Sequence, residues 1–100
     1  LYRHFREEIE QQNLKEGAMQ YLEEVERRFR QEDVPCETST RAGIPAVEIV
    51  KEAEDRKVDL IVLGSHGRSI LGATALGSVA YGVIHHDTKI PVLIIRKQDE

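Results

Sequence analysis

Residues 59–78 read DLIVLGSHGRSILGATALGS, and this segment sets the architecture of the chain. Residues 59–64 form an apolar run of strand length. A continuous run of this kind predicts a strand covered on both faces, as the strands of parallel sheets are. A glycine-rich loop follows at residues 65–73, and we expect a helix from about residue 74 to residue 86.

A second apolar run and a second amphipathic helix flank this segment. Residues 91–95 (PVLII) predict another fully apolar strand. On the other side, Pro45 favours the first turn of a helix, because its missing N–H costs nothing there. Val47, Val50 and Ala53 recur at helical spacing and form the expected inner face of that helix.

The first part of the chain predicts one more helix and one more strand. Asn13 and Glu16 have the spacing of a capping box, and an amphipathic stripe behind them predicts a helix that ends near Glu32. Residues 1–12 are expected to be helical as well. Residues 36–41 (CETSTR) alternate and are rich in Thr and Ser, which predicts a short, exposed strand.

Helices and strands therefore alternate along the chain. This order predicts an α/β fold with a parallel sheet and right-handed crossovers. The chain has the length of one small domain, so we treat residues 1–100 as a single domain. Three strands make a poor parallel sheet, however. We expect this to be the later part of a larger, N-terminally incomplete α/β domain.

Composition excludes several classes of protein. Apolar residues make up 40% and charged residues 32% of the chain, which is typical of a domain with a core rather than of a disordered tail. No run approaches the roughly 20 apolar residues of a membrane helix. The charged first residues do not resemble a signal peptide. A single cysteine, Cys36, suits a reducing compartment, so we expect a cytoplasmic protein without membrane insertion.

Charge is unevenly distributed along the chain. Residues 1–57 carry a balance of −4 and residues 58–100 a balance of zero. Arg68 is the one formally charged residue in the sequence between Leu60 and His86. An anion would avoid the first part and tolerate the second, and the net charge argues against a nucleic-acid partner. The simpler interpretation is that helices are charged and buried strands are not.

The loop after the first apolar strand has the features of a phosphate cradle. Ligands of open α/β sheets bind at the carboxyl ends of strands. Gly64 and Gly67 let the main chain turn and approach a ligand closely. Gly77 and Ser78 lie near the first turn of the next helix, where N–H groups favour phosphate, and Arg68 is the nearby cation. The alternative is a tight turn that binds nothing.

Other glycine motifs do not match. Ala73 stands where a Walker A sequence needs lysine, and no G-x-G-x-x-G is present. The Gly64-x-x-Gly67 tetrad is also found in loops that clamp RNA, but those loops do not follow a buried strand and this chain lacks a basic surface.

The spacing Gly64-x2-Gly67-x9-Gly77-Ser78 resembles the signature of the nucleotide-binding universal stress protein family. DLIVLGSHGRS, LGSVAYGVIHH and PVLIIR also look like that family, and the resemblance extends from about residue 34 to residue 97. It implies a doubly wound parallel sheet of the adenine nucleotide alpha hydrolase-like type, which binds ATP, with Mg²⁺ accompanying it. It also implies a homodimer formed through the last strand, here Val92–Ile95.

The resemblance implies phosphate contacts at Gly64, Gly67, Gly77 and Ser78. The backbone of Val79 and the flanking Ser65 and Arg68 are weaker candidates. Ala80 stands where some members carry Ser or Thr, so one hydroxyl contact is absent. Family members begin with a strand, a helix and a second strand that help to hold the adenosine. This chain contains none of the three, so half of the nucleotide site is expected to be missing.

Three functions remain open. The first is an ATP-binding stress-response module that acts as a dimer, with slow hydrolysis at most. The second is a dimeric interaction or transporter-regulatory domain of the same fold that does not bind nucleotide. The third is a weak ATPase or adenylate-transfer enzyme that uses His66 or Arg68, although an exposed spacer is the simpler role for His66. We assign no catalytic residue and no metal ligand; His85 and His86 are adjacent on a helix and point apart.

Overall fold

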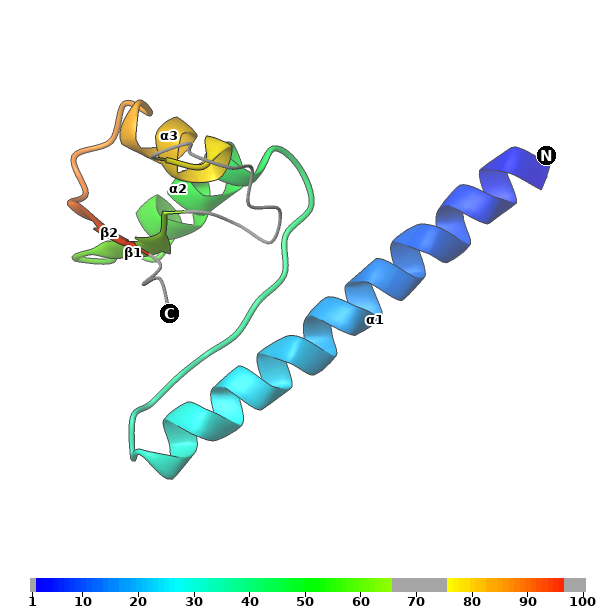
Figure 1. The fold of residues 1–100 in the computed structure, drawn as a ribbon, viewed down its shortest axis with the longest axis horizontal. Helices are drawn as coiled ribbons and strands as arrows, with labels where there is room; N and C mark the ends of the chain where they lie inside the picture. Colours follow the sequence, from blue (N-terminus) through cyan, green and yellow to red (C-terminus); the bar gives the residue numbers. More distant parts are fainter. Residues whose placement is uncertain (1, 66–75, 97–100) are drawn as a thin grey trace. The chain divides into compact units, whose positions relative to one another are not determined.

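The computed structural model describes residues 2–65 and 76–96. The chain falls into two compact units, Leu1–Arg41 and Ala42–Glu100. In the described residues, the first unit contains one long helix, and the second contains two helices and two strands (Figure 1). In chain order the elements are α1 (Tyr2–Gln31), α2 (Pro45–Asp55), β1 (Ile61–Gly64), α3 (Ser78–Ile84) and β2 (Val92–Ile95).

Helix α1 is continuous over 30 residues. The expectation that Asn13 caps a helix start is therefore wrong, because Asn13 lies inside α1 and neither Pro nor Gly interrupts the residues before it. The helix ends at Gln31, close to the expected position. Asp33 adopts a left-handed φ of 57°, and the Val34 N–H donates to the Phe29 carbonyl at 2.9 Å. This is a Schellman C-cap, which satisfies the last carbonyls of the helix.

The strand expected at residues 36–41 is wrong. These residues have no regular secondary structure, and most of their side chains are exposed. A β-strand exists only where a neighbouring strand supplies hydrogen bonds to its backbone. Among the described residues no strand pairs with this segment, so its sequence preference alone does not make it part of a sheet.

Helix α2 starts as the sequence predicts. Pro45 is its first residue, and Ile44 precedes it in an extended conformation as the N-cap. Gly43 has a φ of +139°, which L-residues with a side chain rarely adopt. On the inner face Val50 is 1% and Ala53 6% exposed, which confirms those two positions of the expected stripe.

The two strands are parallel and in register. Ile61 pairs with Val92, and Gly64 pairs with Ile95. Helix α3 makes the crossover between them, as the alternating order predicts. Both strands are slightly shorter than their apolar runs. Helix α3 is likewise shorter than the expected range of residues 74–86, part of which lies outside the described residues.

The core lies on one face of this sheet. Val50 and Ala53 of α2, Val83 of α3 and Ile61 of β1 form the buried cluster, with Leu63 and Val92 packed against it. Helices α2 and α3 contact each other, and the two strands lie side by side (Figure 1).

The opposite face of the sheet is exposed. Val62 is 51%, Leu93 50% and Ile95 55% exposed. The expectation that both faces of these strands are covered is therefore wrong for the described residues. The physical reason is that α2 and α3 both belong to the single core cluster, so neither covers the other face.

Close packing joins the two helices of the second unit. A Cβ atom at Gly82 of α3 would lie 2.7 Å from the Cβ of Ala46 in α2. The absence of a side chain at Gly82 therefore lets the two helices approach at this point.

None of the helices within residues 2–65 and 76–96 combines the length and the apolar character needed to cross a bilayer.

We predict that Lys57→Gly stabilises the second unit. Lys57 follows the C-cap residue Arg56 of α2 and has a left-handed φ of 54°. The Val58 N–H donates to the Ala53 carbonyl at 3.1 Å in a second Schellman cap. A side chain in this conformation costs about 1–2 kcal/mol, partly offset by the entropy that glycine loses on folding. Urea unfolding should show that the free energy of unfolding of Lys57→Gly is about 1 kcal/mol higher than that of the natural chain. The matched change Lys51→Gly, inside α2, should instead lower the free energy of unfolding by about 1 kcal/mol. If both variants are less stable than the natural chain, the assignment of Lys57 to a Schellman cap is wrong.

Candidate functional site

The carboxyl end of β1 is hydrogen-bonded to the residue that starts α3. Ser65 directly follows β1, and its carbonyl accepts a hydrogen bond from the Gly77 N–H at 2.5 Å. The Ser65 N–H donates to the carbonyl of Ile95, at the end of β2, at 2.8 Å. Backbone bonds at this single residue therefore join β1, β2 and α3.

Gly77 and Ser78 form the start of α3. Gly77 is the N-cap, with φ −71° and ψ 163° and no side chain to cap the helix. The Tyr81 N–H donates to its carbonyl at 2.9 Å, which begins the helical hydrogen bonding. N–H groups in a helix's first turn have no acceptor within the helix. Ser78 is exposed, so its hydroxyl adds a donor beside those groups.

Helix α3 has seven residues, so we assign its macrodipole a minor role. The chemical character of this helix start comes from its small residues and backbone N–H groups. Such a set of neutral donors suits an anionic oxygen, which accepts several hydrogen bonds.

The sequence-predicted site residues divide into three groups. Ser65 and Gly77 are in direct hydrogen-bonding contact, and Gly64 is the last residue of β1. Ser78 follows Gly77, whereas Val79 is half-buried and packed against the core, which leaves its backbone as the part suited to binding. Three predicted residues lie outside the described residues: His66, Gly67 and Arg68.

Ser65 and Ile95 play parts that sequence reasoning missed. Ser65 was expected to flank a ligand, but it is only 3% exposed. Ile95 was expected only as part of a dimer strand, yet its carbonyl anchors Ser65. Both roles follow from the parallel register, which places Gly64 opposite Ile95. A local sequence pattern does not reveal that register, so these roles could not be predicted from the sequence.

An aromatic pair lies at the other end of α3. The rings of Tyr81 and His85 stack with centroids 4.0 Å apart. His85 is the C-cap residue, and its Nδ1 donates to the Tyr81 carbonyl at 2.9 Å. This hydrogen bond satisfies one of the last carbonyls of α3. Tyr81 packs on its neighbour while remaining 56% exposed.

The described residues show no cluster that could act as a resident metal site. No group of three or more His, Cys, Asp or Glu side chains comes together within residues 2–65 and 76–96. Cys36 is half-buried, and its Sγ lies 3.8 Å from the carbonyl oxygen of the next residue.

Among the described residues, the carboxyls with shifted pKa values are Glu24 and Glu26 of helix α1. Hydrogen bonds from Arg27 and Arg30 lower the pKa of Glu24 and Glu26 respectively, and the same pairs raise the pKa of both guanidinium groups. Arg28 lies 3.7 Å from Glu24 as a further ion pair. All of these side chains lie on the solvent-exposed surface of α1, where Arg27 pairs with Glu24, three residues before it.

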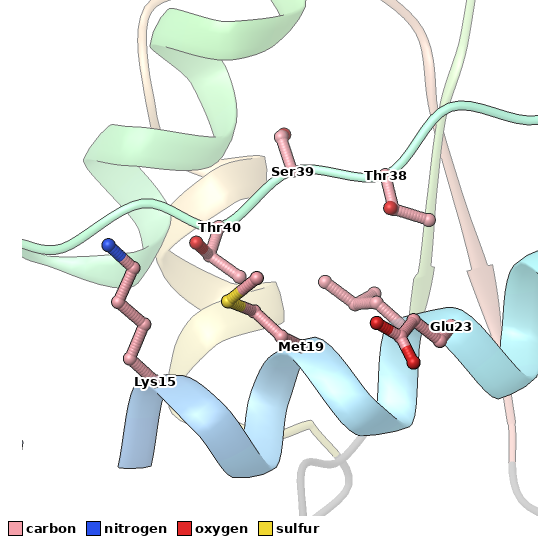
Figure 2. Close-up of a pocket in the computed structure, with 7 residues that line it drawn as sticks. Lys15, Met19, Glu23, Thr38, Ser39 and Thr40 are labelled. Carbon is pink, nitrogen blue, oxygen red and sulfur yellow. The ribbon is translucent and has the colours of Figure 1, made fainter. Parts of the chain in front are cut away.

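A shallow pocket of about 270 Å³ lies within the first unit, between α1 and the extended segment that follows it. Lys15, Met19 and Glu23 reach from α1 toward the segment, and the hydroxyls of Thr38 and Thr40 face the helix (Figure 2). Its walls are mostly exposed side chains, with Met19 47% exposed. The glycine signature contributes no residue to it, so we do not assign it the function of the chain.

Residues 3–96 match the family model described as the universal stress protein family. The chain belongs to this family. It is 41% identical over 93 residues to universal stress protein YxiE of Bacillus subtilis, covering 93% of this chain and 62% of YxiE. It is 37% identical over 86 residues to universal stress protein MJ0577 of Methanocaldococcus jannaschii, covering 86% of this chain and 52% of that protein.

The family's fold is confirmed by a solved structure. The structure of MJ0577 matches this universal stress protein chain with a TM-score of 0.82 at 34% identity, over 90% of this chain and 62% of the other. The predicted α/β class with a parallel sheet is therefore correct, although two strands are present in the described residues. The chain spans 49% to 62% of the length of three curated relatives that it matches.

We predict that acid removes the contribution of the Glu26–Arg30 pair to helix α1. The pKa of Glu26 is lowered in the folded chain below its ordinary 4.5, so the pair stabilises the helix above that pH. Its contribution disappears as the pH falls through the lowered pKa, because the carboxyl is then protonated. Helicity by circular dichroism should be higher in the natural chain than in Glu26→Gln at pH 7, and equal in strong acid. A difference that is independent of pH would contradict this.

Proposed function

We propose that this chain forms the phosphate-binding part of an ATP-binding universal stress protein, a cytoplasmic regulatory module. The observation that carries the proposal is the 2.5 Å hydrogen bond between the Gly77 N–H and the Ser65 carbonyl. It closes the glycine-rich loop of the family signature by joining its two ends at the carboxyl end of β1. Ligands of open α/β sheets bind at such an edge.

The chemistry of the described part of this edge suits a polyphosphate. Gly64, Gly77 and Ser78 are small and uncharged, and the charged residues of the second unit's described part lie elsewhere in the sequence. Backbone N–H groups and a serine hydroxyl hydrogen-bond phosphate oxygens without an opposing carboxylate. In this proposal Mg²⁺ arrives with ATP, held by phosphate oxygens and water, which is how this ion commonly binds nucleotides.

The adenosine is proposed to be held by residues outside this chain. The curated relatives are longer, and this chain spans about half to two thirds of their length (49–62%). The exposed apolar face of β1 and β2 supports a larger fold, because Val62 and Leu93 lie side by side on it in the parallel register. Adjacent apolar side chains on one sheet face are normally covered by another part of a protein.

Binding, rather than turnover, is the proposed activity. Phosphoryl transfer requires an aligned nucleophile in addition to phosphate binding and a metal ion. The residues to which we assign a role contribute hydrogen-bond donors to phosphate and no general base. Any hydrolysis is therefore expected to be slow.

We further propose that two copies associate through β2. Strand β2 pairs with β1 along one edge, and no described strand pairs with its other edge. An unpaired strand edge is a surface on which a second strand can pair. The same observation favours the second candidate function, an interaction or transporter-regulatory domain that has lost nucleotide binding.

Substitutions at Gly77 test the nucleotide site. Gly77→Asp and Gly77→Asn both introduce good N-cap residues of equal size, so each should leave the melting temperature equal or higher. Asp adds a negative charge beside the phosphates, so ATP affinity should fall at least about tenfold further than in Gly77→Asn. Equilibrium binding of a fluorescent ATP analogue, with displacement by ATP, measures the effect.

Equal affinity for ATP in the natural chain and in Gly77→Asp would contradict phosphate binding at this position. If the natural chain and the longer protein both bind no adenine nucleotide while forming dimers, the interaction function replaces the nucleotide-binding one.

Substitution of Leu93 tests the dimer. Pairing two copies at β2 buries Leu93 near its symmetry mate, so Leu93→Glu should weaken the dimer at least about tenfold through charge burial and repulsion. The matched control is Leu60→Glu, which changes an apolar side chain of 47% exposure just before β1. Sedimentation equilibrium should show dissociation of the Leu93 variant alone. An unchanged dimer in Leu93→Glu would exclude β2 as the interface.

A further inference from the structure

Ser65 is an unusual residue in this fold. Ser65 is 3% exposed, and it is the one buried polar residue within residues 12–65 and 76–96, for which side-chain exposure is described. Burying a hydroxyl is costly unless it is hydrogen-bonded. No buried side-chain nitrogen or oxygen in the described part of the chain lacks such a partner. The serine is therefore held in a defined arrangement.

The backbone of Ser65 is equally constrained. Its N–H donates to the Ile95 carbonyl at 2.8 Å, and its carbonyl accepts from the Gly77 N–H at 2.5 Å. One buried residue thus connects the ends of both strands with the N-cap of α3. A displacement of Ser65 would move Gly77, and with it the first turn of α3.

A direct contact with phosphate, which the sequence suggested for Ser65, fits this arrangement poorly. A side chain that is 3% exposed offers almost no surface to a ligand, whereas Ser78 is exposed. What Ser65 does control is the position of Gly77. The arrangement of N–H groups before a ligand arrives is what determines how strongly they bind it.

We propose that Ser65 is a positioning residue, which holds Gly77 by its hydrogen bond and so sets the N–H groups of Ser78 and Val79 for phosphate without touching the ligand. This inference rests on the proposed nucleotide-binding function. It assigns the binding of phosphate to the N–H groups of Ser78 and Val79 and the Ser78 hydroxyl, and it assigns the preorganisation of those groups to the buried serine.

The test is the Ser65→Ala variant of the full chain, with Ser39→Ala as the matched control. Ser39 lies in the other unit, and its substitution makes the same chemical change. The first readout is hydrogen exchange of the Gly77 amide by NMR without nucleotide. Loss of the buried hydroxyl should loosen the junction, so this amide should exchange about tenfold faster in Ser65→Ala and unchanged in Ser39→Ala.

The second readout is ATP affinity, measured at a temperature where circular dichroism shows each variant fully folded. Ser65→Ala should bind ATP about tenfold more weakly, and Ser39→Ala should bind like the natural chain. If Ser65→Ala does not fold, Ser65→Cys, which keeps the side-chain size, should show the same two changes in smaller degree.

Two results would overturn the inference. Unchanged Gly77 exchange with weakened ATP binding would indicate that the serine contacts phosphate directly. Faster exchange with unchanged ATP affinity would indicate a role in stability alone. Failure of the natural chain and of the longer protein to bind ATP is a different outcome, because it removes the proposed function itself.

Discussion

The hydrogen bond from the Gly77 N–H to the Ser65 carbonyl is the contact on which the rest of this structure depends. It joins the first strand of the sheet to the helix that crosses over to the second strand. Because the Ser65 N–H also donates to the Ile95 carbonyl, Ser65 connects the start of the crossover helix to the carboxyl ends of both strands. The small residues at the start of α3 are thereby held at the sheet edge where such folds bind ligands.

Local patterns predicted the second unit well. Pro45 starts α2, and the apolar runs form β1 and β2 in parallel, because helix starts and buried strands leave strong marks in nearby residues. The strand expected at residues 36–41 failed because a strand also requires a partner, and the described strands are hydrogen-bonded only to each other. For the same reason the covering of both sheet faces could not be predicted. It depends on which elements pack there, and α2 and α3 share one core.

The family was predictable from the sequence, whereas the identity and the roles of the site residues stay predictions. The spacing of Gly64, Gly67, Gly77 and Ser78 was sufficient to select the family that residues 3–96 match. The division of work between Ser65 and Ser78 was not, because both are serines beside glycines. One is buried and the other exposed, and that difference arises from the register of two strands distant in sequence. Position along a motif therefore does not distinguish a residue that binds a ligand from one that holds its neighbour.

The central claim is that backbone N–H groups at the start of α3 bind a polyphosphate. An NMR titration of the chain with inorganic triphosphate tests it most directly, because this probe needs no adenosine site. The account predicts saturable amide shifts centred on Gly77, Ser78 and Val79, while the amides of α1 stay unchanged. Shifts spread over the basic side chains of α1, or no saturable shift at these three amides, would contradict it.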